Sequence, residues 1–335
     1  MAGPRAEDFR NFGIVAGPDS PLYGHVCEAI AGSPELLALA ATSSEPMANL
    51  FLAAIHAELL REPDDALAAY YPTAGGDRAA DDALRPALER FCEARRERLE
   101  ATLATRHTQT NETARCSALL PAFASVADGR PLAQIEIGAS AGLNGLWDHY
   151  AYDYGGRPAG EAGSPLQIAC ELIGPQVPPL EPPTVAWRAG IDRSPVDLRD
   201  EADVRWLRAC LWPDQAARHA RLEAALQVAR EHGPVEIHRG DALELLPGVI
   251  DAAPDDALVC VFHSATLIYF GEDKIAELRR LLAERDVAWI AGEAPGLLAE
   301  ENIGPTPHFA LTAGRGGELR QLGRMGHHGG WLEWF

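Results

Sequence analysis

A segment near the middle of the chain carries the residue types and spacing best suited to chemistry. Residues 135–144 read Ile-Glu-Ile-Gly-Ala-Ser-Ala-Gly-Leu-Asn and continue a short apolar run that begins at residue 132. The apolar run predicts a strand, and the glycines predict a turn after it. Two kinds of site use a turn between a strand and a helix. One is a loop whose backbone amides hold a nucleotide, and the other presents a nucleophilic serine.

The first interpretation is a nucleotide-binding loop. Gly138 would let the chain turn sharply after the strand. Gly142 would let the following helix approach the ligand with its N-terminal amides facing it. Glu136 would lie at the end of the strand. The predicted cofactor-binding loop also contains Ala139, Ser140 and Asn144.

The second interpretation is a nucleophile elbow, because Gly138, Ser140 and Gly142 have the Gly-x-Ser-x-Gly spacing of α/β-hydrolases. Those enzymes place several strands and an oxyanion loop before the elbow. Here the preceding residues predict helices only, and no His-Gly-Gly segment precedes the serine. The context therefore favours the nucleotide loop. A hydrolase with Ser140 as nucleophile is the less favoured alternative.

Two further acidic residues follow predicted strands. Asp192 ends the apolar run 185–191, and Asp241 follows the run 235–238 and precedes Ala242. An acid at the end of such a strand accepts hydrogen bonds from the ribose hydroxyls of a nucleotide. Asp192 is therefore predicted to contact a cofactor. For Asp241 and Ala242 a cofactor contact is implied by the family resemblance given below.

The position of Asp192 departs from the usual spacing. A ribose-binding acid normally lies about 20 residues beyond the glycine loop, whereas Asp192 lies 50 residues beyond Gly142. The assignment therefore requires an inserted flap over residues 151–184. If no such insertion exists, Asp153 takes the place of Asp192.

Taken together, the acidic-x-Gly-x-x-x-Gly loop and the two later acids resemble the motifs of class I S-adenosylmethionine-dependent methyltransferases. The resemblance covers residues 132 to about 325. It implies a Rossmann-like sheet with S-adenosylmethionine as cofactor. In such a site Glu136 and the loop hold the amino-acid end of the cofactor. Asp192 holds the ribose, and Asp241 receives the adenine amino group.

Methyl transfer asks for little covalent chemistry from the protein, which aligns the acceptor and removes a proton where one has to leave. His263 follows the predicted strand 257–262 and is the best-placed base, since imidazole titrates near neutrality. Glu293 follows the strand 287–291 and is the second predicted catalytic residue. The chain has no Asp/Asn-Pro-Pro-aromatic motif of amino-group methylation, so the acceptor atom stays open.

A polar stretch before the first predicted strand is the candidate substrate site. Residues 106–115 read Arg-His-Thr-Gln-Thr-Asn-Glu-Thr-Ala-Arg. One interpretation is a helix N-terminus capped by Asn111, with Glu112 and Arg115 as a solvated pair. The other is that the stretch lines the substrate cleft at the ligand edge of the sheet. The residues that would do so are Arg106, Gln109, Asn111, Glu112 and Arg115.

The predicted elements divide the chain near residue 130. Residues 1–130 predict helices, among them 46–60, 84–103 and 111–127, and would form a helical cap or substrate domain. Residues 131–335 alternate apolar runs of strand length with helical segments, which predicts a parallel sheet with crossover helices.

The helical segments of this second part are 201–211, 214–231 and 273–284. Residues 308–312 and 319–324 predict an antiparallel hairpin, and 331–335 predict one more strand. The expected fold class is therefore α/β. It combines an N-terminal helical domain with a Rossmann-like methyltransferase domain, mostly parallel, that carries the flap.

The composition limits the classes of binding partner that we expect. The chain has 335 residues and a formal net charge of −20, from 29 Lys and Arg against 49 Asp and Glu. Such a charge repels phosphate backbones at long range. We therefore expect no nucleic-acid and no membrane partner, and a small-molecule or basic acceptor. Residues 1–12 carry charges and no apolar signal segment, so a cytoplasmic location is expected.

The number and spacing of the cysteines also favour a cytoplasmic protein. The six cysteines lie at least 24 residues apart, so no Cys-x-x-Cys pair exists for zinc or redox chemistry. We expect reduced, mostly buried thiols and no metal site. The sequence leaves the oligomeric state open.

The chain as a whole also resembles an uncharacterised bacterial family filed as domain of unknown function 2332. That family carries no established activity, so the resemblance implies no chemistry. The expected function is S-adenosylmethionine binding and methylation of a small molecule; the alternative from another class is a non-catalytic binder of S-adenosylmethionine or a nucleotide. The segments that carry the resemblance are 103–106, 109–112, 115–116, 138–144, Asp192, 206–214 and 327–334.

Overall fold

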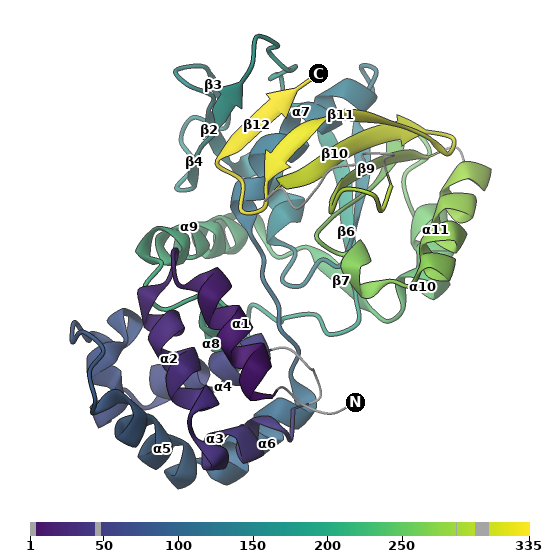
Figure 1. Ribbon diagram of the computed structural model, residues 1–335. Helices are drawn as coiled ribbons and strands as arrows, with labels where there is room; N and C mark the ends of the chain where they lie inside the picture. The colour runs from purple at the N-terminus through teal and green to yellow at the C-terminus, as the bar shows by residue number, and fades with distance from the viewer. Residues whose placement is uncertain (1–4, 44–47, 286, 299–307) are drawn as a thin grey trace. The chain divides into compact units, whose positions relative to one another are not determined.

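Apolar side chains at helical spacing fill the first hundred residues, and in the computed structural model these residues form helices (Figure 1). The structure describes residues 5–43, 48–285, 287–298 and 308–335. The predicted helix 46–60 is present as α4, although Pro46 and Met47 lie outside the described residues. The helices of this part are α1 (Ala6–Ala16), α2 (Pro21–Ala31), α3 (Pro34–Ala40), α4 (Ala48–Arg61), α5 (Leu84–Ala94) and α6 (Arg96–Thr105), with the 3-10 helices η1 (Ala66–Tyr70) and η2 (Pro72–Ala74).

The predicted single helix 84–103 is two helices. Arg95, between α5 and α6, has φ −122° and ψ 15°, outside the α-helical region. Leu88 on α5 and Leu99 on α6 are both fully buried. The apolar pattern therefore continues across the break, which is why periodicity alone does not reveal it.

The chain divides into two compact units. The helical unit contains residues 1–110 and 196–220, and the α/β unit contains residues 111–195 and 221–335. The structure thus differs from a boundary at 130/131 in two places. Residues 111–130 belong to the α/β unit, and a segment from the second half of the chain belongs to the helical unit.

Buried contacts account for both differences. Trp206 on α8 (Glu201–Ala209) is buried in the core of the helical unit and donates a hydrogen bond to His107 O (3.0 Å). Asp214 accepts from the Leu22 N–H at the start of α2 (3.1 Å). Helix α7 (Cys116–Val126) instead packs against strands β9 (Ala288–Glu293) and β10 (His308–Arg315) of the α/β unit.

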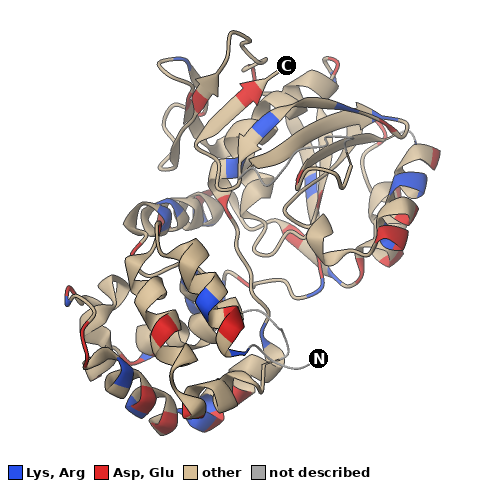
Figure 2. Cartoon of the chain, viewed as in Figure 1, with Lys and Arg blue, Asp and Glu red and all other residues tan. Residues whose placement is uncertain are grey.

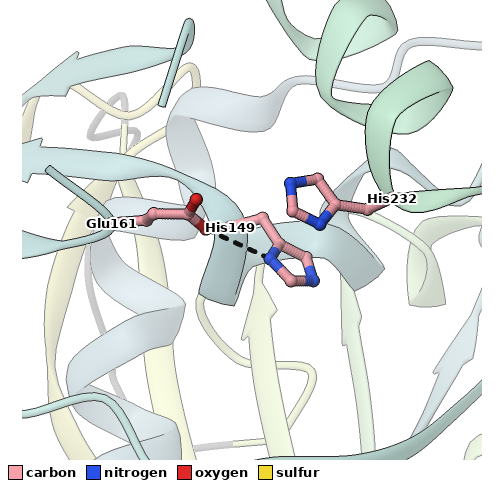
Figure 3. A group of neighbouring side chains, drawn as sticks. All are labelled: His149, Glu161 and His232. Atoms are coloured by element: carbon pink, nitrogen blue, oxygen red, sulfur yellow. Dashed lines mark hydrogen bonds and ion pairs between the residues drawn. The ribbon is translucent and has the colours of Figure 1, made fainter. Parts of the chain in front are cut away.

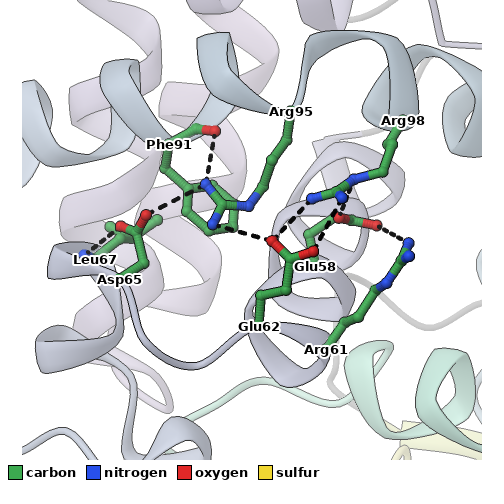
Figure 4. A network of polar contacts seen from close by, with 8 residues as sticks. All are labelled: Glu58, Arg61, Glu62, Asp65, Leu67, Phe91, Arg95 and Arg98. Carbon is green, nitrogen blue, oxygen red and sulfur yellow. Dashed lines mark hydrogen bonds and ion pairs between the residues drawn. The ribbon is translucent and has the colours of Figure 1, made fainter.

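Acidic residues of the helical unit are paired with arginines (Figure 4). Glu58 Oε2 lies 2.8 Å from Arg98 Nε, and Glu62 Oε1 lies 2.9 Å from Arg98 Nη1. Arg95 extends the network to Asp65 (3.2 Å). These pairs join α4 to α6 and to the chain that follows α4.

In the described chain the α/β unit contains a nine-stranded mixed sheet in the order β5-β12-β11-β10-β9-β8-β1-β6-β7 (Figure 1). Neighbouring strands from β9 to β7 run parallel, and β9, β10, β11 and β12 are successively antiparallel. This confirms the α/β class with a mostly parallel sheet and antiparallel C-terminal strands. The remaining strands are β1 (Leu132–Ile137), β5 (Glu171–Ile173), β6 (Val185–Asp192), β7 (Glu236–Arg239), β8 (Leu258–Ser264), β11 (Glu318–Gly326) and β12 (Trp331–Trp334).

The segment between β1 and β6 contains an inserted sheet. Strands β2 (Ala151–Asp153), β3 (Pro158–Gly160) and β4 (Gln167–Ala169) form a separate three-stranded sheet, and β5 joins the main sheet beside β12. Strand β1 pairs with β6 from Leu132 to Ile137, with one irregularity after Leu132. The prediction that 185–191 is the second strand is therefore confirmed, and Asp153 lies in the inserted sheet.

The order of the parallel strands reverses beside β1. The chain runs from β1 to β6 and β7 on one side, and then returns to β8 and β9 on the other. Helices α9 (Ala216–His232), α10 (Ala242–Asp251) and α11 (Glu272–Glu284) lie in the connections between these strands. In open parallel sheets, ligands bind at the carboxyl ends of the strands where the order reverses. Here that place is the edge formed by the ends of β1 and β8.

Three general features complete the fold. No helix within the described residues is long and apolar enough to span a membrane. All six cysteines are free and buried, as expected. Charges of both signs are interspersed on α11 (Figure 2), which is typical of a solvated helix face.

Candidate functional site

The loop after β1 turns through three left-handed residues. In this β1 loop (residues 138–143), φ is +73° at Gly138, +54° at Ser140 and +72° at Gly142. Gly138 is also required by space, because a Cβ there would lie 2.6 Å from Thr266 Oγ1. Ser140 is not a glycine, so its backbone is strained. The predicted tight turn is present, with glycine at two of its three left-handed positions.

The helix that follows is not the one expected. Residues Leu143–His149 form the 3-10 helix η4, which is kinked at Leu146 (φ −104°, ψ 16°). Such a short 3-10 helix lacks the aligned N-terminal amides of an α-helix. A helix dipole facing the ligand is therefore not part of this site.

Strand β6 holds the first half of the β1 loop. The N–H groups of Gly138 and Ala139 donate to Ile191 O (2.8 and 3.3 Å). The Ser140 N–H donates to Asp192 Oδ2 (2.8 Å). These bonds join the carboxyl ends of β1 and β6, and they use backbone donors that the sequence analysis had assigned to the cofactor.

Asn111 holds the second half of the loop. Its Nδ2 donates to Ala139 O (3.3 Å), and its Oδ1 accepts from the N–H groups of Ala141 and Leu143 (3.0 and 3.5 Å). The Gly142 N–H donates to Ala139 O (2.7 Å). Every amide of the β1 loop thus has an acceptor within the protein. The loop is a rigid turn that a ligand can contact through side chains, whereas its backbone donors are already engaged.

Glu136 is a buried acid with one oxygen left over. Its Oε1 accepts from Asn144 Nδ2 (3.2 Å), and Asn144 Oδ1 faces the thiol of Cys116 (3.6 Å). Its Oε2 is buried and no described residue meets full hydrogen-bond geometry with it, although the Gly145 N–H lies close enough to the carboxyl to lower its pKa. Burial raises the pKa of the Glu136 carboxyl well above its usual range, against the opposing effect of the Asn144 hydrogen bond. An uncompensated carboxylate here is costly.

Asp192 ends β6 beside the loop, as predicted. One oxygen accepts from Ser140 N–H and the other from Ser194 N–H (2.7 Å). Asp192 therefore positions the turn. Each carboxylate oxygen can accept more than one hydrogen bond, so Asp192 keeps acceptor capacity beyond these two donors.

Asp241 follows β7 and caps α10. It accepts from Leu243 N–H (3.0 Å) and from Lys274 Nζ (2.7 Å), and the hydrogen bond from Lys274 lowers its pKa. Ala242 is the buried first residue of α10. These contacts match a helix cap, which is the structural alternative to an adenine-binding acid.

His263 and Glu293 form a buried pair. His263 Nδ1 lies 2.7 Å from Glu293 Oε1, and Trp289 Nε1 lies 2.9 Å from His263 Nε2. Indole N–H can only donate, so Nε2 accepts and Nδ1 carries the proton. Both ring nitrogens are engaged and the side chain is fully buried. This arrangement gives His263 no nitrogen with which to take a proton from a substrate.

Glu293 organises the chain after β8. Its carboxylate also accepts from Thr266 N–H (2.9 Å) and Leu267 N–H (3.2 Å), at the start of η5 (Leu267–Tyr269). Thr266 is the residue that contacts Gly138. His263 and Glu293, the two predicted catalytic residues, therefore hold Thr266 in place beside the β1 loop. In this geometry they are positioning residues.

Two other residues of the predicted substrate stretch also lie in the α/β unit and bind protein groups. Arg115 donates to His327 O (2.8 Å) and to Ser264 O at the end of β8 (3.5 Å). Glu112 Oε1 lies 3.4 Å from Arg221 Nε. Neither forms the solvated pair of the helix-cap interpretation, because both are buried. With Asn111, they connect the loop edge to the surrounding strands.

Arg106 and Gln109 are placed differently. Both belong to the helical unit, where Arg106 Nη1 pairs with Asp203 (2.6 Å). The predicted substrate residues are therefore divided between the two units.

A family comparison covers nearly the whole chain. The model of the DUF2332 family, described as an uncharacterized protein conserved in bacteria, matches residues 6–334. The chain belongs to the DUF2332 family. No curated protein and no solved structure matches it. The comparisons therefore add nothing to the methyltransferase resemblance.

In this DUF2332 chain, the candidate site is marked by buried polar atoms at the sheet edge that have no hydrogen-bond partner in the described structure. Glu136 Oε2, Ser140 Oγ and Ser264 Oγ are buried, and in the described part of the chain none has a hydrogen-bond partner. They lie at the carboxyl ends of the adjacent strands β1 and β8. The sequence singled out Glu136 and Ser140. It missed Ser264, Thr266 and Cys116, since nothing in their local sequence marks them as neighbours of the loop.

Proposed function

We propose that the chain binds S-adenosylmethionine at the carboxyl edge of β1, β6 and β8, and that it methylates a small molecule. Three features support the proposal. The order of the parallel strands reverses beside β1, a glycine-bearing turn follows β1, and acids lie at the ends of β1 and β6. This combination is typical of nucleotide-binding α/β proteins.

The observation that carries the proposal is the buried carboxyl of Glu136. Its environment raises the pKa and leaves Oε2 without a donor in full hydrogen-bond geometry. A ligand with an ammonium group supplies both the missing donor and the missing positive charge. The amino-acid end of S-adenosylmethionine carries such a group. Ser140 Oγ, also buried and unpartnered in the described structure, offers a further hydrogen bond at the same turn.

Asp192 would hold the ribose through the acceptor capacity left by Ser140 and Ser194. The part assigned to Asp241 and Ala242 at the adenine rests on the sequence resemblance, because Asp241 already binds Lys274 and caps α10. When bound, the cofactor supplies an electrophilic methyl group. The protein fixes the turn through Asn111 and braces its wall through the His263–Glu293 pair, which favours transfer by alignment.

Titration calorimetry of wild type and Glu136→Gln with S-adenosylmethionine and S-adenosylhomocysteine tests the proposal. Charge-assisted hydrogen bonds are worth about 1.5–3 kcal/mol, so the variant should bind at least tenfold more weakly. With ligand present at 100 times Kd, the free energy of unfolding of the wild-type protein should rise by about 2.7 kcal/mol. A wild type with no affinity for either compound would refute the proposal. Binding without methyl transfer would favour a non-catalytic binder.

A serine hydrolase is the second candidate, and one observation favours it. Ser140 has a strained left-handed backbone, as the serine of a nucleophile elbow does, and its Oγ is unpartnered within the described residues. That same hydroxyl has no described histidine to activate it, and β1 is the first strand of the sheet. Labelling of Ser140 by a fluorophosphonate probe would decide for the hydrolase.

A further inference from the structure

A second group of ligand-type side chains lies in the α/β unit, where η4, the inserted sheet and the end of α9 meet. It consists of His149, Glu161 and His232, and one ligand atom of each lies within 4.8 Å of those of the other two (Figure 3). His149 ends η4, Glu161 follows β3, and His232 ends α9. We propose that these three residues bind a divalent transition ion, zinc in the first place.

The donor set suits that ion. Two imidazoles and one carboxylate are the protein ligands of many three-ligand zinc sites, with bonds of about 2.0–2.2 Å. In a tetrahedral site such bonds place neighbouring ligand atoms roughly 3.4 Å apart. His149 Nδ1 and Glu161 Oε2 are already 3.2 Å apart. The His232 ligand atom lies within 4.8 Å of the other two and has to come closer. An exposed side chain at a helix end can rotate to do so.

The backbone holds two of the ligands in place. Residue Ala151 pairs with Gly160 between β2 and β3, and the Glu161 N–H donates to Tyr150 O (2.9 Å). The ligands His149 and Glu161 immediately adjoin these bonded residues. Their separation is therefore set by the hydrogen bonds of the inserted sheet.

The two histidines face each other closely. Their ring centroids are 3.7 Å apart and the rings are inclined by 20°. An imidazole nitrogen coordinates a metal in the plane of its ring, so two rings stacked in this way bind one ion only after one of them has turned. His232 also lies at the C-terminal end of α9, where the helix dipole favours a positive charge.

A second carboxylate faces the other side of His149. Asp148 Oδ2 lies 3.7 Å from His149 Nε2 and 2.9 Å from Arg188 Nη2. At 3.7 Å this carboxylate is a charged neighbour of the ring and not a hydrogen-bond acceptor. Ligating histidines commonly have a carboxylate behind the ring nitrogen that does not bind the metal. Three protein ligands leave a fourth position for water or another donor. The bound ion would link the end of α9 to the inserted sheet.

Zinc titration against a chromophoric chelator tests the site in untagged full-length protein. Wild type should bind one zinc ion per chain. The variants His149→Ala, Glu161→Gln and His232→Ala should each bind at least tenfold more weakly. The matched control is His25→Ala, an exposed histidine on α2 of the helical unit, which should bind as wild type does.

Two further readouts separate a built site from loose surface binding. Cobalt should give the visible absorption of a four- or five-coordinate site in wild type, and lose it in His149→Ala and His232→Ala. Zinc should raise the Tm of wild type and of His25→Ala, and leave the Tm of His232→Ala unchanged. The proposal is overturned if wild type binds no stoichiometric zinc. It is equally overturned if the three variants bind within twofold of wild type.

Discussion

The acids at and just after the end of α4 in the helical unit and the buried acid at the sheet edge of the α/β unit have opposite surroundings. In the helical unit Glu58, Glu62 and Asp65 face arginines, so their charges are neutralised by the protein itself (Figure 4). At the edge of the sheet Glu136 is buried, its pKa is raised, and one of its oxygens lacks a donor in full hydrogen-bond geometry among the described residues. The first arrangement serves the fold. The burial of Glu136 without full compensation lowers the stability of the fold. Such destabilising groups are found mainly at functional sites.

The largest expected effect comes from closing the turn beside Glu136. In Gly138→Val a β-branched side chain would have to adopt φ +73° and would strike Thr266. We expect loss of S-adenosylmethionine binding and a clear loss of stability, roughly 1–3 kcal/mol. Chemical denaturation and calorimetry measure the two effects.

The control for that variant is Gly155→Val. Gly155 also has positive φ (+65°), but a Cβ there meets nothing within 4 Å. It reports the backbone strain alone, and its affinity for the cofactor should equal that of wild type. Equal affinities in both variants would mean that the β1 loop does not contact the ligand.

Asp192→Asn gives the next effect. The change keeps the size of the side chain, but it removes the charge that would accept from the ribose and replaces one of the two oxygens that accept from Ser140 and Ser194 with an NH2 group. With charge-assisted bonds of about 1.5–3 kcal/mol each, S-adenosylmethionine should bind at least tenfold more weakly. Asp153→Asn in the inserted sheet is the matched control, because Asp153 is exposed and accepts from Gly156 in its own turn. If S-adenosylmethionine binds more weakly to Asp153→Asn but not to Asp192→Asn, the assignment of Asp192 to the ribose is excluded.

Much of the main sheet could be predicted from the sequence, because strands buried on both faces leave continuous apolar runs. The run 185–191 was assigned as the second strand although 50 residues separate Asp192 from Gly142, and β6 occupies that place. The break at Arg95 and the 3-10 form of η4 could not be predicted. Both depend on packing that leaves the apolar pattern unchanged.

The candidate site was predictable in part for a related reason. Glu136, Asp192 and the glycines are marked by their places after strands. The clamp of Asn111 on the β1 loop, and the engagement of His263 by Trp289, are contacts between residues far apart in sequence. The His149–Glu161–His232 group also has no spacing signature, since its members come from three elements.

The comparison of the two kinds of acid is sharpest in the pH dependence of stability. A raised pKa in the folded state means that the stability contributed by protonated Glu136 is full below its unfolded pKa and is lost as pH rises. Without ligand, Glu136→Gln should therefore raise the Tm at pH 7.5 by more than at pH 4. Thermal unfolding at the two pH values measures this.

Glu62→Gln should behave in the opposite sense. The hydrogen bond from Arg98 lowers the pKa of Glu62, so its contribution is present above the unfolded pKa and is lost as pH falls. We expect a small decrease of Tm at pH 7.5 that disappears at low pH, since this side chain is only half-buried and solvent screens its ion pair. Shifts of the same sign in the two variants would remove the distinction between them.

The smallest expected effect concerns the other leftover group of the turn, Ser140. If its hydroxyl only adds a neutral hydrogen bond to the ligand, Ser140→Ala should weaken S-adenosylmethionine binding by about 0.5–1.5 kcal/mol, far less than Asp192→Asn does. A fluorophosphonate probe should then label neither wild type nor variant. Labelling of wild type that disappears in Ser140→Ala would show that the strained backbone presents a nucleophile. The unpartnered hydroxyl of Ser140, rather than the carboxyl of Glu136, would then be the functional group at the sheet edge.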